Sequence, residues 1–301
     1  MGATLLYGVK VVVITDMSTD IKLREGRAED ATACGTICYE AFTTIAKAHN
    51  FTPDFPSVDV AVGLMSFLLS HPAFYSVVAE LDGKVVGSNF LDERSAVAGL
   101  GPITVDPALQ NRKVGRELME NAHARAGEKK FSGVRLVQAG YHTRSLSLYS
   151  KLGYDVREPL ACMQGTALKT KIAGCTVRKA AESDIEACNR VCQKVHGHDR
   201  GGELKDAIAK STVVERDGRV TGYATVIGFF GHAVGESNQD LKALIGAATE
   251  FAGPGFLLPT RNTELFQWCL QEGIRVTQPM TLMSKGFYNE PAGAFLPSIL
   301  Y

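Results

Sequence analysis

The sequence predicts an α+β fold made of two tandem copies, each a mixed, mostly antiparallel sheet flanked by helices. Three observations predict it. The length of 301 residues suits two domains of ordinary size. Stretches of the first half recur in the second. Within the first half, a run of strands is followed by strands that alternate with helices, as in mixed α+β folds.

The internal repeat has three parts in the same order in both halves. The matched stretches are 23–38 with 177–192, 80–87 with 215–222, and 153–163 with 273–283. The middle pair reads ELDGKVVG and ERDGRVTG, and each has Asp-Gly at the turn of a predicted hairpin. The chain is therefore expected to be a tandem duplication. Its expected parts are an N-terminal extension (1–20), a first domain (21–164), a linker (165–174) and a second domain (175–301).

The first copy is expected to begin with a strand and two helices. The first helix has an apolar stripe at positions 34, 37, 38, 41, 42 and 45. A meander of three strands follows, and then two helices alternate with two strands. The expected elements are strand 21–25, helix 28–49, helix 58–70, strands 75–80, 84–93 and 97–105, helix 115–131, strand 134–139, helix 143–152 and strand 154–158.

Composition and charge exclude several classes of function. Lys and Arg together number 32, as do Asp and Glu, so no overall basic field favours a nucleic acid or an anionic membrane. The seven cysteines include no CxxC pair, which argues for a reducing compartment and against a metal site. The apolar stretch 9–14 is too short to span a bilayer. We expect a cytoplasmic protein without a metal, either a monomer or a homodimer.

The stretch from Val105 to Leu118 carries the chemistry. A strand-like run meets a proline turn, a polar and basic loop follows, and an amphipathic helix opens near Gly115. Such a loop leaves unpaired backbone N–H groups at the positive end of the helix dipole. This arrangement predicts a site for phosphate.

This segment resembles the first signature of the GNAT superfamily of acetyl-CoA-dependent N-acetyltransferases, Gln/Arg-x-x-Gly-x-Gly/Ala. Gln110 and Gly115 fit the signature, while Lys113 stands at its first glycine. Lys113 removes the residue that best permits close approach to phosphate, but adds an ammonium group that can pair with it.

A second stretch, HTRSLSLYSKLGY (142–154), is similar to the family's second signature, Asn-x-x-Ala-x-x-Leu-Tyr-x-x-x-Gly-Phe. Leu148, Tyr149 and Gly153 fit, whereas His142 replaces Asn and Ser145 replaces Ala. The two signatures occur in the family's order, and the resemblance extends over residues 21–164.

The resemblance implies roles for these residues. The strand before the loop would bind the pantetheine arm as an added strand, and the loop would hold the pyrophosphate of acetyl-CoA. The cofactor-binding residues so implied are Ile103, Thr104, Val105, Gln110, Asn111, Arg112, Lys113, Val114, Gly115, Arg116, His142 and Ser145. Tyr149 would protonate the departing thiolate, in direct transfer without an acyl-enzyme.

The general base and the acceptor site are less defined. Glu93 or Asp92 is a candidate base, although a solvated charge cluster with Arg94 explains both equally well. The loop 48–56 lies where the family shapes its acceptor site, so His49, Phe51 and Phe55 either line that site or close a surface loop. In the second copy, candidate substrate residues are His232, Glu236 and Arg261, which line the pocket or cap loops.

The second copy is expected to have lost the cofactor site. Cys269 occupies the position that corresponds to Tyr149 of the first copy. The segment 231–244 lacks the Gln/Arg-x-x-Gly-x-Gly signature and places the acidic residues Glu236 and Asp240 at the helix start, where they would repel phosphate. The tail 284–301 either ties down the chain or seals the seam between the copies. The expected function is acetylation of a primary amine of a small molecule, such as an amino sugar or an aminoglycoside. The alternatives are protein N-terminal or lysine acetylation, and a non-catalytic acyl-CoA sensor.

Overall fold

The structure, a computed structural model, describes residues 21–301; the expected extension 1–20 lies outside the described residues. The strands and α-helices of the first copy are β1 (Lys22–Glu25), α1 (Ala31–Ala48), α2 (Val58–Ser70), β2 (Phe74–Leu81), β3 (Lys84–Asp92), β4 (Val97–Leu100), β5 (Thr104–Val105), α3 (Val114–Glu128), β6 (Gly133–Ala139), α4 (Thr143–Lys151) and β7 (Asp155–Gln164). Those of the second copy are β8 (Thr176–Lys179), α5 (Ile185–His196), α6 (Gly201–Ala207), β9 (Thr212–Arg216), β10 (Arg219–Ala224), β11 (Ala233–Gly235), α7 (Asn238–Ala247), β12 (Phe256–Pro259), α8 (Thr263–Gln271), β13 (Arg275–Gly286) and β14 (Ala294–Leu296).

Helices α1 and α3 are up to three residues shorter at one end than expected, and two strands differ more. The strand expected over 97–105 is broken into β4 and β5, because Gly101 adopts φ +128° and Pro102 has no N–H to continue the ladder. The strand expected over 154–158 continues to Gln164, because β13 and β12 of the second copy pair along it.

The strands form two sheets, mostly antiparallel, as the α+β prediction required. The larger has nine strands in the order β1-β2-β3-β4-β6-β13-β7-β12, with β5 paired to β3. The smaller has the order β14-β11-β10-β9-β8. The pair β4–β6 is parallel and covers only three residue pairs, the last being Gly99 with Arg135. Beyond that pair the two strands part.

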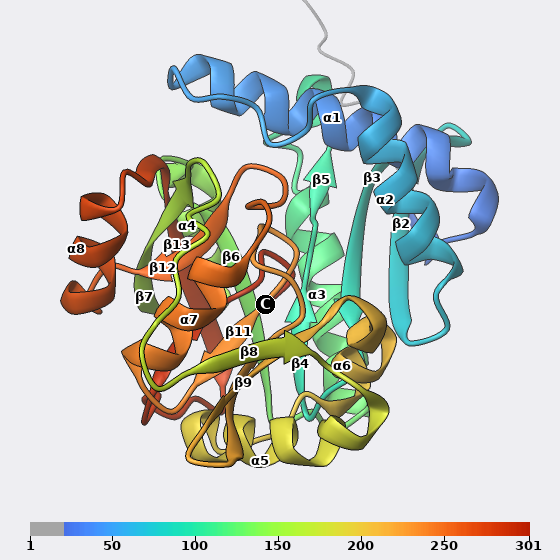
Figure 1. The fold of residues 1–301 in the computed structure, drawn as a ribbon. Coiled ribbons are helices and arrows are strands. Elements are labelled where there is room, and N and C mark those ends of the chain that lie inside the picture. Colours follow the sequence, from blue (N-terminus) through green and yellow to red (C-terminus); the bar gives the residue numbers. More distant parts are fainter. Residues whose placement is uncertain (1–20) are drawn as a thin grey trace, which may run out of the picture.

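The two copies share the larger sheet by exchanging strands (Figure 1). Strand β13 of the second copy lies between β6 and β7 of the first, with Met283 opposite Leu136 and Pro279 opposite Ala161. In turn, β7 pairs with β12 of the second copy. Within the described residues, strand β7 therefore has no neighbour from its own copy. The sequence boundary between the copies, from Gln164 to Thr176, is not a boundary of the sheet.

The duplication is visible in matching side-chain geometry. Arg24 binds both carboxylate oxygens of Asp30 at 2.7 and 2.8 Å and also pairs with Glu80. Arg178 binds Asp184 at the same two distances and also pairs with Glu215. The second copy has thus kept the packing of its first strand, helix and hairpin.

Different layers cover the two faces of the sheet around β6. Side chains of Val134 and Leu136 pack under α3 and α4 with Met119 and Tyr149. The alternate side chains, Val137 and Ala139, pack on the opposite face with the second copy and with the segment after β13. The site described below lies where both faces become accessible, at the parting of β4 and β6.

Candidate active site

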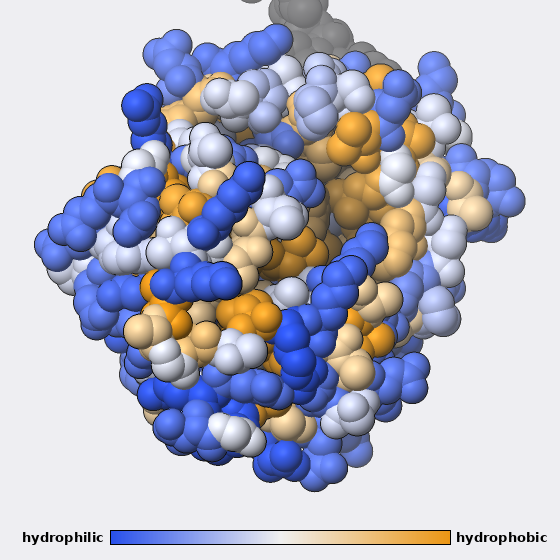
Figure 2. Space-filling view, in the orientation of Figure 1, coloured by the Kyte–Doolittle hydropathy of each residue, from blue (hydrophilic) through white to orange (hydrophobic). Residues whose placement is uncertain are grey.

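A cavity of about 550 Å³ opens where β4 and β6 part. It is lined by residues from both faces of the sheet, with Leu136, Leu148 and Tyr149 on the α3–α4 face and Val137, Ala139 and Met280 on the other. Figure 2 shows a hollow with hydrophobic walls on this side of the molecule, beneath α1. A ligand in this cavity can therefore reach through the sheet from one face to the other.

The α3–α4 end of the cavity is built for an anion. The loop before α3 and the first turn of that helix bring Gln110, Asn111, Lys113, Gly115 and Arg116 to the cavity wall. The first intrahelical bonds of α3 are donated by Arg116 and Glu117, both to the carbonyl of Lys113. Among the described residues, the backbone N–H groups of 111–115 have no acceptor, so they remain available at the positive end of the helix.

Cationic side chains reinforce that end. Lys113, Arg116, Arg144 and Lys151 all line the cavity, and Arg144 donates to the side-chain oxygen of Gln110 at 2.7 Å. Four cations beside unpaired N–H groups match the charge of several phosphate groups.

Lys113 stands at the N-cap of α3 with φ +66°, in the left-handed region. This conformation costs a non-glycine residue about 1 kcal/mol. The backbone conformation explains why the signature has a glycine at this position. In this chain a lysine adopts it and places its ammonium group at the cavity.

The start of α4 is held by His142. Its Nδ1 accepts from the backbone N–H of Ser145 at 3.2 Å, and the pKa of His142 is lowered by burial, which keeps that nitrogen free to accept. In the second copy, Asn262 caps α8 in the same way, accepting from Leu265 at 3.3 Å. A histidine can therefore replace the asparagine of the signature without loss of the cap.

Two further features fit the pantetheine and phosphate parts of acetyl-CoA. Gly115 lines the cavity, and a Cβ there would meet no protein atom closer than 3.8 Å, so it would project towards the ligand space. Gln138 also lines the cavity, with 6% of its surface exposed, and neither side-chain amide atom has a partner among the described residues. Buried amide groups are normally hydrogen-bonded, so Gln138 fits a ligand amide.

Comparison with known proteins agrees with this geometry. Residues 39–154 match the model of the acetyltransferase (GNAT) family. This part of the chain is a GNAT acetyltransferase domain. No curated protein sequence matches the chain significantly.

Solved structures show that the described part of the chain has a tandem GNAT fold. A putative acetyltransferase from Pyrococcus horikoshii superposes with a TM-score of 0.70 at 15% identity, covering 91% of this chain and 94% of that one. A GCN5-related N-acetyltransferase from Sphaerobacter thermophilus gives 0.59 at 14% identity, with coverages of 90% and 96%. A tandem GNAT protein from the clavulanic acid biosynthesis pathway gives 0.54 at 14% identity, with coverages of 89% and 98%.

Most residues that the GNAT signatures implied line the cavity, and two do not. The lining residues are Ile103, Thr104, Val105, Gln110, Asn111, Lys113, Gly115, Arg116, His142, Ser145 and Tyr149. Arg112 is exposed beside the cavity, and the side chain of Val114 is buried in the core beneath α3. Strand β5 pairs with β3 on one edge only, which leaves its other edge facing the cavity.

The candidate base Glu93 does not line the cavity. Its carboxylate is bound by Arg125 at 2.6 and 3.0 Å, and the Asp92 carboxylate is held by Arg94 at 2.5 and 2.8 Å. Asp92 thus pairs with Arg94, whereas Glu93 pairs with Arg125 from α3, and both carboxylates are largely shielded from solvent.

Only one of the three candidates in the loop 48–56 reaches the cavity. Phe55 lines it and packs edge-on against Phe42, with ring centroids 6.0 Å apart. Phe51 stacks on Tyr141 at 4.4 Å, and His49 lies 5.4 Å from the same ring. Phe51 and His49 therefore pack against Tyr141 and do not line the cavity.

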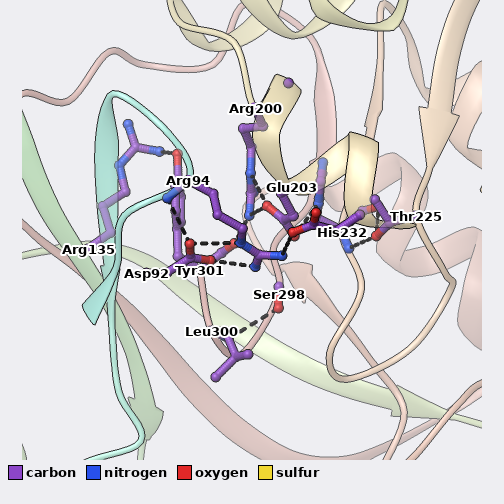
Figure 3. A network of polar contacts seen from close by, with 12 residues as sticks. Asp92, Arg94, Arg135, Arg200, Glu203, Thr225, His232, Ser298, Leu300 and Tyr301 are labelled. Atoms are coloured by element: carbon purple, nitrogen blue, oxygen red, sulfur yellow. Dashed lines mark hydrogen bonds and ion pairs between the residues drawn. The ribbon is translucent and has the colours of Figure 1, made fainter. Parts of the chain in front are cut away.

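The second-copy candidates lie elsewhere. His232 is buried between Glu203 and the hydroxyl of Tyr223, at 3.0 Å from each, within a network that also holds Arg200 and Tyr301 (Figure 3). Glu236 is bound by Arg219 and Lys194. Arg261 pairs with Glu158 and lines a separate cavity of about 310 Å³. None of the three lines the larger cavity, because each is held by partners inside or beside the second copy.

The larger cavity contains residues that the sequence did not indicate. Asp54 lines it and accepts from the side-chain amide of Gln278 at 2.9 Å. Phe229, Phe230 and Leu300 of the second copy also line it. Asp54 lies in the loop already singled out for the acceptor, so its position was a usable signal, whereas Gln278 reaches the site only through strand exchange.

The second copy has no equivalent of the phosphate loop. Between β4 and α3 the first copy has the segment 101–113, whereas β11 ends at Gly235 and α7 begins at Asn238. The Asp240 carboxylate binds the N–H of Ser237 at 2.9 Å and the hydroxyl of Thr221 at 2.6 Å, and so occupies the helix start. Strand β14 of the tail pairs with β11, on the edge that β4 offers to β6 in the first copy.

Two further findings concern metal-binding groups and membrane-spanning helices in the described residues. Within 21–301, no group of three or more His, Cys, Asp or Glu side chains is arranged to hold a metal ion. In the same range, no helix combines the length and the apolar character needed to cross a membrane.

Proposed function

We propose that the chain transfers the acetyl group of acetyl-CoA to a primary amine of a small molecule, using a single cofactor site in the first copy. The observation that carries this proposal is the cavity through the sheet. Its basic end, with the α3 loop, suits a nucleotide phosphate, and its other end is enclosed by side chains of both copies. Direct transfer requires the two substrates to meet in such a through-going space.

The residues of the basic end have distinct tasks in this proposal. The N–H groups of 111–115 and the four cations hold the phosphates, and the free edge of β5 binds the pantetheine arm. Bound there, acetyl-CoA supplies a thioester. The amine nitrogen forms a bond to the acetyl carbon, the carbon–sulfur bond breaks, and the sulfur finally carries a proton while the amine gives one up.

Tyr149 is placed to assist the sulfur. Its ring is buried between α4 and β6, and its side chain lines the cavity. Burial raises the pKa of Tyr149 to about 12, with the Ser145 hydroxyl opposing part of the shift. At that pKa the hydroxyl stays protonated across the physiological range but is a weaker acid than an ordinary tyrosine. We therefore assign it a hydrogen bond to the sulfur that strengthens as negative charge develops, rather than early proton transfer.

The test is release of free CoA thiol from acetyl-CoA with a panel of amines. Tyr149→Phe should lower kcat about 10²-fold and leave CoA affinity unchanged, because the ring still fills its place. Tyr154→Phe is the matched control: Tyr154 is also buried, its ring centroid is 6.2 Å from that of Tyr149, and its hydroxyl bonds His123. If none of the amines is acetylated although CoA binds measurably, the result would contradict the proposal and favour a sensor.

Titration calorimetry tests the single site. One CoA should bind per chain, because the second copy has Asp240 and strand β14 where the first copy has its phosphate loop and open strand edge. Two equivalent sites would contradict this part of the proposal.

A further inference from the structure

The end of the cavity away from the phosphate loop is apolar. Its walls are Phe42, Phe55 and Leu64 from the first copy and Phe229, Phe230, Met280, Ile299 and Leu300 from the second. Phe230 is 43% exposed, although aromatic side chains of this size usually avoid water. An amino sugar would find few hydrogen-bonding groups on these walls, and desolvating its hydroxyls there would be costly.

One charged group interrupts the apolar wall. Of the residues that line the cavity, Asp54 alone is acidic, while all the cations belong to α3, α4 and the loop before α3. The Oδ1 atom of Asp54 accepts from Gln278, and Oδ2 has no hydrogen-bond partner among the described residues. The carboxylate therefore has one oxygen held by the second copy and one free for a ligand.

Asp54 also lacks a counter-ion in the described part of the chain. No cationic side chain there forms an ion pair with it, and burial raises its pKa with only the Gln278 hydrogen bond opposing. Asp54 is half-buried, and a carboxylate partly withdrawn from water without a counter-ion bears an uncompensated desolvation cost. A cation from the ligand would complete this site.

Gln278 fixes the orientation of the carboxylate. Its side-chain oxygen accepts from the hydroxyl of Tyr141 at 3.4 Å, so its NH₂ group is directed to Asp54. Tyr141 in turn is stacked on Phe51. Gln278 lies at a bulge of β13, where the pairing with β7 shifts between Val276 and Gln278.

From this arrangement we infer that the acceptor is a primary amine on an apolar body, an alkyl or arylalkyl amine, whose ammonium group is bound by Asp54. The inference rests on the proposed function, which makes acetyl-CoA the donor. It adds the class of acceptor that the same site would bind. The apolar body packs against the phenylalanines of both copies. Asp54 thus selects a charged amine, and the walls select against hydroxylated ones. An ammonium nitrogen has no lone pair, so it gives one proton to the Asp54 carboxylate before it attacks the acetyl carbon, and Asp54 later releases that proton to solvent.

Binding of 2-phenylethylamine to the CoA-saturated protein tests the inference directly, with glucosamine as the polar amine of comparison. Wild type should bind 2-phenylethylamine at least tenfold more tightly than glucosamine. Asp54→Asn should weaken 2-phenylethylamine binding about 10- to 100-fold, the range for loss of a hydrogen-bonded charge. Its CoA affinity and Tm should match those of wild type. Asp59→Asn, the same change at an exposed residue of α2, is the matched control.

Failure of this inference is distinguishable from failure of the proposed function. No binding of 2-phenylethylamine, equal binding of glucosamine, or unchanged binding in Asp54→Asn would overturn the inference, even if some amine is acetylated. Binding that follows the expected pattern without release of CoA thiol would uphold the ammonium site and contradict the transferase proposal.

The pH profile supplies a second readout. The groups facing Asp54 from neighbouring elements are Tyr141, Cys38 and Cys162, and the pKa of each is raised by burial, to about 12 for Tyr141 and about 11 for Cys162. All three are therefore neutral below pH 8. His142 also lines the cavity and has a lowered pKa, but it caps α4 at the phosphate-binding end. 2-Phenylethylamine stays an ammonium ion below pH 8, so its own titration does not enter its binding there. Because the pKa of Asp54 is raised, the affinity for 2-phenylethylamine should fall as pH drops through a value above that of an ordinary aspartate. Asp54→Asn should lack this fall, and its persistence would count against the inference.

Discussion

Lys113 shows how a single residue can depart from a signature and still keep the backbone that the signature requires. Its φ of +66° is the conformation for which glycine is the usual choice, and Asn111 two residues earlier has φ +68°. The loop therefore keeps its shape through local strain. The chain accepts that strain and gains an ammonium group at the cavity.

Lys113→Gly is expected to raise the free energy of unfolding by up to about 1 kcal/mol, because the left-handed strain disappears. It should also weaken CoA binding about fivefold at low salt, and less at high salt, since an exposed charge is lost. Denaturant melts and CoA titrations at two salt concentrations measure both effects.

Asn111→Gly is the control for Lys113→Gly, because it relaxes a similar backbone conformation without changing the charge. Its gain in stability should be smaller, since asparagine tolerates positive φ better than lysine. Equal losses of CoA affinity in the two variants would show that the Lys113 ammonium group has no part in binding.

Residue-level prediction from sequence was uneven for physical reasons. The loop from Gln110 to Arg116 was predictable because its function depends on backbone N–H groups and a helix start, which local sequence encodes. Glu93 and His232 were plausible by residue type, but Arg125 and Glu203 bind them from distant parts of the chain. Asp54 could be placed in the acceptor loop, yet its importance depends on Gln278, which the sequence alone does not bring near it.

At the scale of elements, capping residues repeat between the copies although their identities differ. His142 and Asn262 each accept from the N–H three residues ahead, at the starts of α4 and α8. The cap at α4 also fixes the first turn of the helix that carries Tyr149. The polar residue at the first position of the second signature is therefore explained by its capping hydrogen bond as well as by any contact with a ligand.

His142→Ala should lower the free energy of unfolding by about 1 kcal/mol, the usual cost of losing an N-cap side chain. His142→Asn should retain most of that stability, because asparagine performs the same task at α8. Chemical denaturation of the variants, with Asn262→Ala beside them, provides the comparison. An asparagine variant as unstable as the alanine variant would contradict the capping role.

Element boundaries were predictable where local chemistry fixes them. Helix α2 occupies 58–70 as expected, because Ser57 caps its first turn by accepting from Val60. The break between β4 and β5 was missed because strand-forming residues lie on both sides of Gly101 and Pro102, from Val97 to Leu100 and from Ile103 to Val105. The extension of β7 to Gln164 was missed because its partners, β12 and β13, come from the other copy.

At the scale of the whole molecule, the second copy takes part in the site of the first. It provides the strand beside β6, the amide that holds Asp54, and much of the apolar wall. A copy that lost its own phosphate loop thus remains necessary for the shape of the remaining site.

Residues 21–164 expressed alone are expected to aggregate or to melt without cooperativity, because β6 lacks β13 and β7 lacks both of its partners. Co-expression with 165–301 should restore a soluble complex, since the exchanged strands can pair between separate chains. Size-exclusion chromatography and thermal melts provide the measurements. A monomeric 21–164 with a cooperative transition would contradict this expectation.

The strand exchange also has a consequence for biosynthesis. As the ribosome extends the chain, β6 and β7 emerge long before β12 and β13, so the half-made sheet has open, hydrophobic edges during much of translation. Native pairing of these strands is non-local, which slows folding. The nascent chain is thus a natural client for chaperones that shield strand edges, and slower translation of the second half would lengthen its exposure.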